Sequence, residues 1–215
     1  MAKLKEKFKF RLDGCVQVMG TKMFPLPSKS NVFYYNNEVT NPIEDEQILK
    51  VLDSLEFKEG FCYQNSNKIV KALEQIGVDA EFYAGWLFYM SDYPVHHSWV
   101  VIDDKFVIDM SVNVLAFKEY KKECEANEPD SMDEARRLLI EVNERVEQNN
   151  ENSQLGVAGE VPEFAFYIGG KSTPYKARKN FNDMIDQLAD EHPTYSRDGM
   201  NPHGRSKIQQ MRQEK

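Results

Sequence analysis

The chain has few cysteines and no long apolar stretch. Cys15, Cys62 and Cys124 are odd in number, widely spaced and without a CxxC pair, so neither a disulfide framework nor a structural zinc site is indicated. No apolar run approaches the roughly 20 residues of a membrane-spanning helix. The basic start, MAKLKEKFKFRLDGC, lacks the apolar segment of a signal peptide. We therefore expect a cytoplasmic protein with no membrane partner.

An excess of positive charge is also missing. The 27 Lys and Arg residues are outnumbered by 35 Asp and Glu residues, which gives a formal net charge of -8 and a pI near 5.2. A protein that binds nucleic acid needs a concentrated basic surface to displace the counterions of the phosphates. Nucleic acid is therefore not expected as a partner.

The length and composition predict a single domain. With 215 residues, of which 41% are hydrophobic and 12% aromatic, the chain can bury one sizeable core. We predict that the domain covers residues 1–192, with a core segment over about 42–113 and a helical extension over about 115–192. Residues 193–215 have little apolar content and are predicted to form a mobile basic tail.

Two helices are predicted in the core segment. In NPIEDEQILKVLDSL, Asn41 is a suitable N-cap and Pro42 a suitable first helical residue. The second helix starts at Cys62 in GFCYQNSNKIVKAL and ends before Gly77, which is typical of a C′ residue. Its core-facing stripe, at steps of four and three residues, would consist of Cys62, Ser66, Ile69, Leu73 and Ile76.

Strands are predicted after this second helix. DAEFYAGWLFYM and VHHSWVVI read as an antiparallel pair, and KFVIDMS follows the Asp103-Asp104 turn as a third strand. EFAFYIGG is a candidate further strand, and Thr173 with Pro174 marks the start of a late helix. The predicted fold class is α+β, with a helix packed on an antiparallel sheet and additional C-terminal helices.

Cys62 is a candidate nucleophile because of its place at the start of a helix. The free backbone N–H groups and the positive end of the helix dipole stabilise a thiolate there. The same N–H groups are suited to binding the oxyanion of an acyl-transfer reaction. Gln64 and Asn65 are further candidates for that oxyanion site, although Asn65 is about as well suited to a hydrogen bond with a neighbouring loop.

A candidate base lies in VHHSWVVI, where His96 and His97 must face opposite sides of the strand. His97 shares its face with Trp99 and Val101, an apolar surface suited to packing on the Cys62 helix. We therefore favour His97 and keep His96 as the alternative base. Opposite faces also keep the two imidazoles from converging on one metal ion, so neither a metal nor another cofactor is expected.

A third polar residue is needed to orient the histidine. A carboxylate that accepts the second ring N–H fixes the tautomer of the imidazole. Asp109 is well placed for this role because it alternates with Val107 and Ser111 in the strand that follows His97. In chain order, Cys62 thus lies on a predicted helix, His97 on a predicted strand and Asp109 on the neighbouring strand.

These residues resemble those of the papain-like and transglutaminase-like cysteine enzymes, whose core is a nucleophile helix packed on an antiparallel sheet that carries His and Asp. The resemblance is closest to small bacterial and phage forms with three short motifs, which match CYQNS, HSW and DMS in this chain. It covers residues 57 to about 113. It implies a thiolate nucleophile at Cys62, a base at His97 and an orienting carboxylate at Asp109.

The resemblance also implies a class of chemistry, which is attack on a peptide, protein or small amide or ester substrate through a thioester. Hydrolysis of the peptidase or amidase type is the first expectation. The alternatives are acyl transfer or transglutamination by the same residues, and an inactive binding protein that keeps the scaffold. Trp86 and Trp99 are predicted to line the substrate cleft. The pattern indicates no particular oligomeric state.

Overall fold

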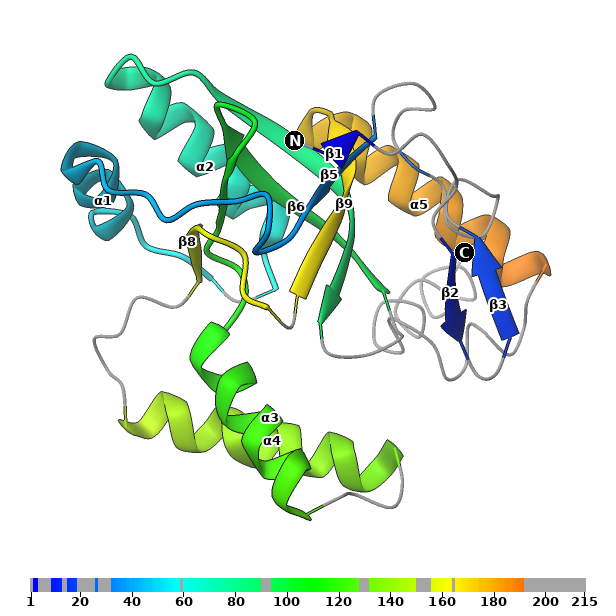
Figure 1. Ribbon diagram of the computed structural model, residues 1–215. Coiled ribbons are helices and arrows are strands. Elements are labelled where there is room, and N and C mark those ends of the chain that lie inside the picture. The colour runs from blue at the N-terminus through cyan, green and yellow to red at the C-terminus, as the bar shows by residue number, and fades with distance from the viewer. Residues whose placement is uncertain are drawn as a thin grey trace, which may run out of the picture.

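Helices and antiparallel strands combine in the fold (Figure 1). The computed structural model describes residues 2–3, 9–12, 15–18, 26, 32–58, 60–89, 94–127, 132–149, 156–163 and 165–191. The predicted α+β class is confirmed at this coarse level. The tail predicted for residues 193–215 lies outside the described residues.

An antiparallel sheet forms the centre of the described part of the chain. Its strand order is β1-β4-β9-β5-β6-β7-β8, and each neighbouring pair is antiparallel. The strands comprise Ala2–Lys3 (β1), Phe33–Tyr35 (β4), Ala80–Tyr89 (β5), Pro94–Ile102 (β6), Phe106–Asp109 (β7), Val157–Gly159 (β8) and Ala165–Lys171 (β9). A separate hairpin joins Lys9–Leu12 (β2) and Cys15–Val18 (β3).

The late strand β9 is part of the centre of this sheet. The antiparallel series predicted over residues 79–111 is confirmed, because β5 pairs with β6 and β6 pairs with β7. The strand predicted in EFAFYIGG is present as β9, and it lies between β4 and β5. The segment predicted as a helical extension therefore also completes the sheet, and it places Tyr167 opposite Leu87.

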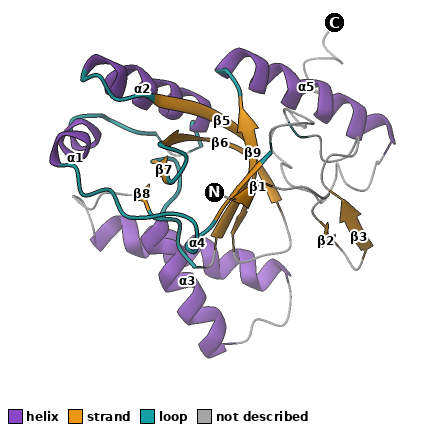
Figure 2. Ribbon diagram, turned by 45° about the horizontal axis from the view of Figure 1, so that its top comes forward, coloured by secondary structure: helices purple, strands orange, loops and turns teal. Residues whose placement is uncertain are grey.

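Helices flank the sheet. They comprise Glu46–Asp53 (α1), Cys62–Gln75 (α2), Val114–Asn127 (α3), Met132–Asn149 (α4) and Pro174–Glu191 (α5). α2 and α5 lie together on one side of the sheet, and the α3–α4 pair lies toward the other side (Figure 2). Thr173 and Pro174 begin α5 as predicted, and the Thr173 hydroxyl accepts the backbone N–H of Lys176. No helix in the described segments is both long and apolar enough to cross a membrane.

The first helix begins later than predicted. Asp45, and not Asn41, is the N-cap of α1, and its carboxylate accepts the backbone N–H groups of Gln47 and Ile48. Asn41 instead donates its own backbone N–H to the carbonyl oxygen of Lys105 at 3.3 Å. Asn and Asp are both good N-caps, so a tertiary contact that the local sequence does not reveal decides between them.

The second helix, α2, begins at Cys62 as predicted. It ends at Gln75, and Gly77 has a φ of 80°, a left-handed conformation that favours glycine at the end of a helix. Ile76 is 39% exposed, so it does not continue the buried stripe. The buried face of α2 consists of Cys62, Asn65, Ser66, Ile69 and Leu73.

α2 packs on the face of β6 that is opposite to the predicted one. One core cluster joins α2 to β6 and includes Ile69, Leu73, Val100 and Ile102. Trp99 and Val101 belong to a different cluster, on the other face of the strand. The prediction that the face of His97, Trp99 and Val101 packs on the helix is therefore wrong. Both faces of β6 are covered and apolar, so the sequence pattern did not distinguish them.

Candidate active site

Cys62 is the first residue of α2 and is 9% exposed. Phe61 precedes it as the N-cap and makes no side-chain capping bond, and the first turn contains no acidic residue. The backbone N–H groups of this turn therefore have no side-chain cap, and the positive end of the helix dipole lies beside Cys62. Both features favour a negative charge on the sulfur.

Two adjacent residues of β6 act on the Cys62 side chain. The pairing between β6 and β7 covers Val100–Ile102 and does not extend to His97 or Ser98. Both of these residues lower the pKa of the Cys62 thiol, which indicates that its side chain lies near this part of β6. His97 and Ser98 point to opposite faces of the strand, but a group located at the strand edge can reach both. Cys62 therefore meets His97 although its helix packs on the other face.

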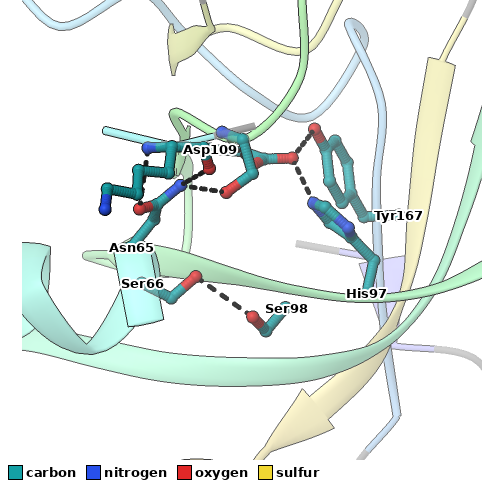
Figure 3. Close-up of polar contacts among 8 residues, drawn as sticks. Asn65, Ser66, His97, Ser98, Asp109 and Tyr167 are labelled. Carbon is teal, nitrogen blue, oxygen red and sulfur yellow. Dashed lines mark hydrogen bonds and ion pairs between the residues drawn. The ribbon is translucent and has the colours of Figure 1, made fainter. Parts of the chain in front are cut away.

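His97 is bonded to Asp109 on its other side. Nε2 of His97 lies 2.7 Å from Oδ2 of Asp109, and both side chains are buried (Figure 3). Because the carboxylate occupies Nε2, Nδ1 is the ring nitrogen left for Cys62. Asp109 is the last residue of β7. The structure thus brings His97 and Asp109 into one buried pair that acts on Cys62 and lowers the pKa of its thiol.

The charges in the Cys62–His97–Asp109 series shift the pKa of the cysteine and of the histidine. Burial raises the pKa of the Cys62 thiol, but the charge of His97 and hydrogen bonds from His97 and Ser98 outweigh burial, so that the pKa is lowered overall. Burial lowers the pKa of His97, but Asp109 and Cys62 outweigh it and raise that pKa to about 10. Between the two pKa values, Cys62 is a thiolate and His97 an imidazolium.

His96 lies on the other face of β6 and has different partners. Its Nδ1 is 2.7 Å from the hydroxyl of Tyr63, and its ring meets the ring of Trp86 edge to face with centroids 5.2 Å apart. Burial and the charge of His97 lower the pKa of His96 to about 3, so it is neutral near pH 7. Among the described residues, no group of three or more His, Cys, Asp or Glu side chains is arranged to hold a metal ion.

Asn65 connects the segment before α2 to the end of β7. Its Nδ2 donates to the carbonyl oxygen of Lys58 at 2.7 Å and to Oγ of Ser111 at 3.0 Å. Its Oδ1 accepts the backbone N–H of Lys58 at 3.3 Å. These bonds use both ends of the amide and favour the role of a loop anchor over that of an oxyanion donor. Gln64, the other candidate, is exposed on the first turn of α2.

Replacing Asn65 by alanine is expected to lower the free energy of unfolding by about 1–3 kcal/mol, because the buried Ser111 hydroxyl and the part-buried backbone groups of Lys58 lose their hydrogen bonds. Urea denaturation followed by circular dichroism measures the change. Asn67→Ala is the matched control, since Asn67 is only half-buried on the same helix and alanine is the better helix former. Equal losses in the two variants would contradict the anchoring role.

Trp86 and Trp99 do not line one cleft. Both side chains are fully buried, and they lie on opposite faces of the sheet. Trp86 packs against His96, whereas Trp99 packs against Tyr167 with ring centroids 5.0 Å apart. The prediction of a shared cleft wall is therefore wrong. In a sheet that is covered on both faces, alternating aromatic residues form the core on either side.

Ser98 and Tyr167 were not among the predicted site residues. Ser98 lowers the pKa of Cys62, and its Oγ lies 3.2 Å from Oγ of Ser66. Tyr167 donates its hydroxyl to Oδ2 of Asp109 at 2.9 Å. The sequence did point to Ser98, because it lies between two residues that were predicted to belong to the site, His97 and Trp99. Tyr167 had no such signal, because its contact depends on where β9 joins the sheet.

Comparison of the chain with protein-family models, with curated protein sequences and with solved structures gave no match. The family resemblance therefore rests on the motifs around Cys62, His97 and Asp109. Function is best argued from the chemistry of these side chains.

Proposed function

We propose that the protein is a cysteine hydrolase of the papain-like or transglutaminase-like type, which cleaves an amide or ester bond. The observation that carries this proposal is the buried bond between Nε2 of His97 and Oδ2 of Asp109 at 2.7 Å, together with the effect of His97 on Cys62, whose pKa it lowers. A nucleophilic cysteine needs a stabilised thiolate, a nearby base and a group that orients the base. His97 is suited to the second role, and Asp109 to the third through its bond to Nε2.

In the first half of the proposed reaction, the Cys62 thiolate attacks the carbonyl carbon and a C–S bond forms. The carbonyl oxygen takes up the negative charge, and the backbone N–H groups in the first turn of α2 are suited to stabilise it. The intermediate then collapses, and the bond to the leaving amine or alcohol breaks. The His97 imidazolium gives its Nδ1 proton to that leaving group, so that a thioester and a neutral imidazole remain.

In the second half, water attacks the thioester. Neutral His97 accepts a proton from the attacking water, and the C–S bond breaks to release a carboxylic acid and restore the thiolate–imidazolium pair. The net reaction consumes one water and one amide or ester. An amine in place of water would give acyl transfer, so analysis of the products with added hydroxylamine separates the two outcomes.

The first test is the rate of alkylation of Cys62 by iodoacetamide between about pH 5 and about pH 9. An ordinary thiol with a pKa of about 8.5 is only about 0.3% thiolate at about pH 6. We expect Cys62 to react faster than such a thiol at that pH, because its pKa is lowered. Peptide mass spectrometry reports the extent of reaction at each cysteine.

Cys124 is an internal control in the same sample. It is half-buried on α3, and it shows how a cysteine outside the Cys62–His97–Asp109 series reacts with the same reagent. If the rates at Cys62 and Cys124 rise over the same pH range, the proposal of an activated nucleophile fails. The reading as a non-catalytic binding protein would then replace it.

A further inference from the structure

The Asp109 carboxylate accepts three hydrogen bonds from separate parts of the fold. Oδ2 accepts both Nε2 of His97 at 2.7 Å and the hydroxyl of Tyr167 at 2.9 Å, and Oδ1 accepts the backbone N–H of Ser111 at 3.0 Å (Figure 3). Because donors hold both oxygens, the carboxylate cannot rotate about its Cβ–Cγ bond without breaking at least one of these bonds.

Tyr167 reaches this position because β9 is inserted in the middle of the sheet. Its side chain is fully buried. The ring packs against Trp99 and lies 6.4 Å from the ring of His97, centroid to centroid. Packing on these two rings restricts the tyrosine to an orientation in which its hydroxyl meets Asp109. Tyr167 also lies far outside the segment that carries the family resemblance.

We propose that Tyr167 is a positioning residue for the Cys62–His97–Asp109 series, and that its hydroxyl fixes the Asp109 carboxylate and thereby the His97 ring. This inference rests on the proposed function. Without the hydroxyl, the N–H of Ser111 is the one donor, of the three described here, that still fixes the carboxylate independently of the His97 ring. The carboxylate then turns more freely, and the imidazolium that it supports becomes less stable relative to the neutral ring.

Tyr35 offers a matched comparison for Tyr167. Both tyrosines are fully buried and belong to the same core cluster. The Tyr35 side chain interacts with that of Tyr83, with ring centroids 5.8 Å apart, whereas the hydroxyl of Tyr167 is bonded to Asp109. Removing either hydroxyl therefore perturbs the same core, but only one removal affects the carboxylate.

The experiment compares Tyr167→Phe with Tyr35→Phe. For each variant, Cys62 alkylation by iodoacetamide is measured against pH, and the His97 Nε2 proton is followed by NMR in protein with ¹⁵N-labelled histidine. The pH window is the pH range over which Cys62 is a thiolate while His97 is an imidazolium. In Tyr167→Phe we expect this window to narrow at both ends, by about one pH unit in total. The Nε2 proton should also exchange with water about tenfold faster. In Tyr35→Phe, both quantities should remain as in the wild type.

If Tyr167 has a purely structural role, its substitution lowers the yield or the stability of the folded protein but does not move the limits of the pH window. The inference is overturned if Tyr167→Phe leaves both measurements unchanged, or if the two variants change them equally. Should Tyr167→Phe not fold, p-aminophenylalanine placed at position 167 keeps the ring and a weaker donor. This variant must then give a narrower pH window than the wild type.

The two measurements also separate failure of this inference from failure of the proposed function. If wild-type Cys62 shows no reactivity below the range of an ordinary thiol, the proposed function fails. The Nε2 proton still reports whether Tyr167 holds Asp109 and His97 together, because that signal does not depend on the nucleophile. If wild-type Cys62 is activated and Tyr167→Phe changes nothing, the positioning role alone is rejected.

Discussion

Replacing His97 by glutamine is expected to slow the alkylation of Cys62 at about pH 6 severalfold or more. The imidazolium is the main partner that lowers the pKa of the thiol, and an ordinary thiol is almost fully protonated at that pH. Hydrolysis should fall by about 10²–10⁴-fold, because the base and the proton donor are lost together. Glutamine keeps a donor able to reach Asp109, so the fold should survive, and circular dichroism would check this.

The neighbouring His96→Gln substitution is the matched control. His96 is bonded to Tyr63 and is neutral near pH 7 because its pKa is about 3. Both measured rates should therefore stay within about threefold of the wild type. Similar losses at the two histidines would mean that His97 has no special role as the base.

The local parts of the fold were predictable because local patterns determine them. The start of α2 at Cys62 and its end before Gly77 follow from helical spacing and from a glycine in a left-handed conformation. The hairpin that carries His97 and Asp109 follows from strand alternation around a tight turn, and both Asp103 and Asp104 adopt positive φ there. These short-range features place the two residues on adjacent strands.

The parts that were not predictable depend on contacts between distant segments. The alternation in β6 assigns His96 and His97 to opposite faces, but it does not say which face receives α2, because Val100 and Val101 are equally apolar and equally buried. His97, the residue predicted as the base, is the one bonded to Asp109, but the face of β6 on which it lies is not the face that packs on α2.

The contact between Asp109 and a tyrosine from a distant strand is a further long-range feature of the site. Tyr167 is far from Asp109 in sequence, and it reaches the carboxylate only because β9 lies between β4 and β5. Strand order in a sheet follows from the packing of the whole domain, and a single sequence contains no direct record of it. EFAFYIGG was predicted as a strand, but its place in the sheet, between its neighbours β4 and β5, was not predicted.

Replacing Asp109 by asparagine is expected to lower hydrolysis by about 10³–10⁴-fold and to raise the pH at which Cys62 becomes reactive. The carboxylate is the leading favourable influence on the raised pKa of His97, so a neutral amide removes the charge that stabilises the imidazolium. The amide N–H₂ group also cannot accept a bond from Nε2 of His97, from Tyr167 or from Ser111. With one acceptor oxygen left for these donors, we expect a loss of about 1–3 kcal/mol in the free energy of unfolding.

Asp104→Asn is the control for the loss of a negative charge nearby. Asp104 lies in the β6–β7 turn, is half-buried and has a φ of 57°, a conformation that asparagine also tolerates. This substitution should leave the pH dependence of Cys62 alkylation unchanged, because Asp104 is not among the charges that shift the pKa of Cys62 or of His97. If Asp109→Asn changes only the unfolding free energy and the pH dependence of Cys62 stays as in the wild type, Asp109 is a structural residue of the core. The proposed series would then reduce to Cys62 and His97 alone.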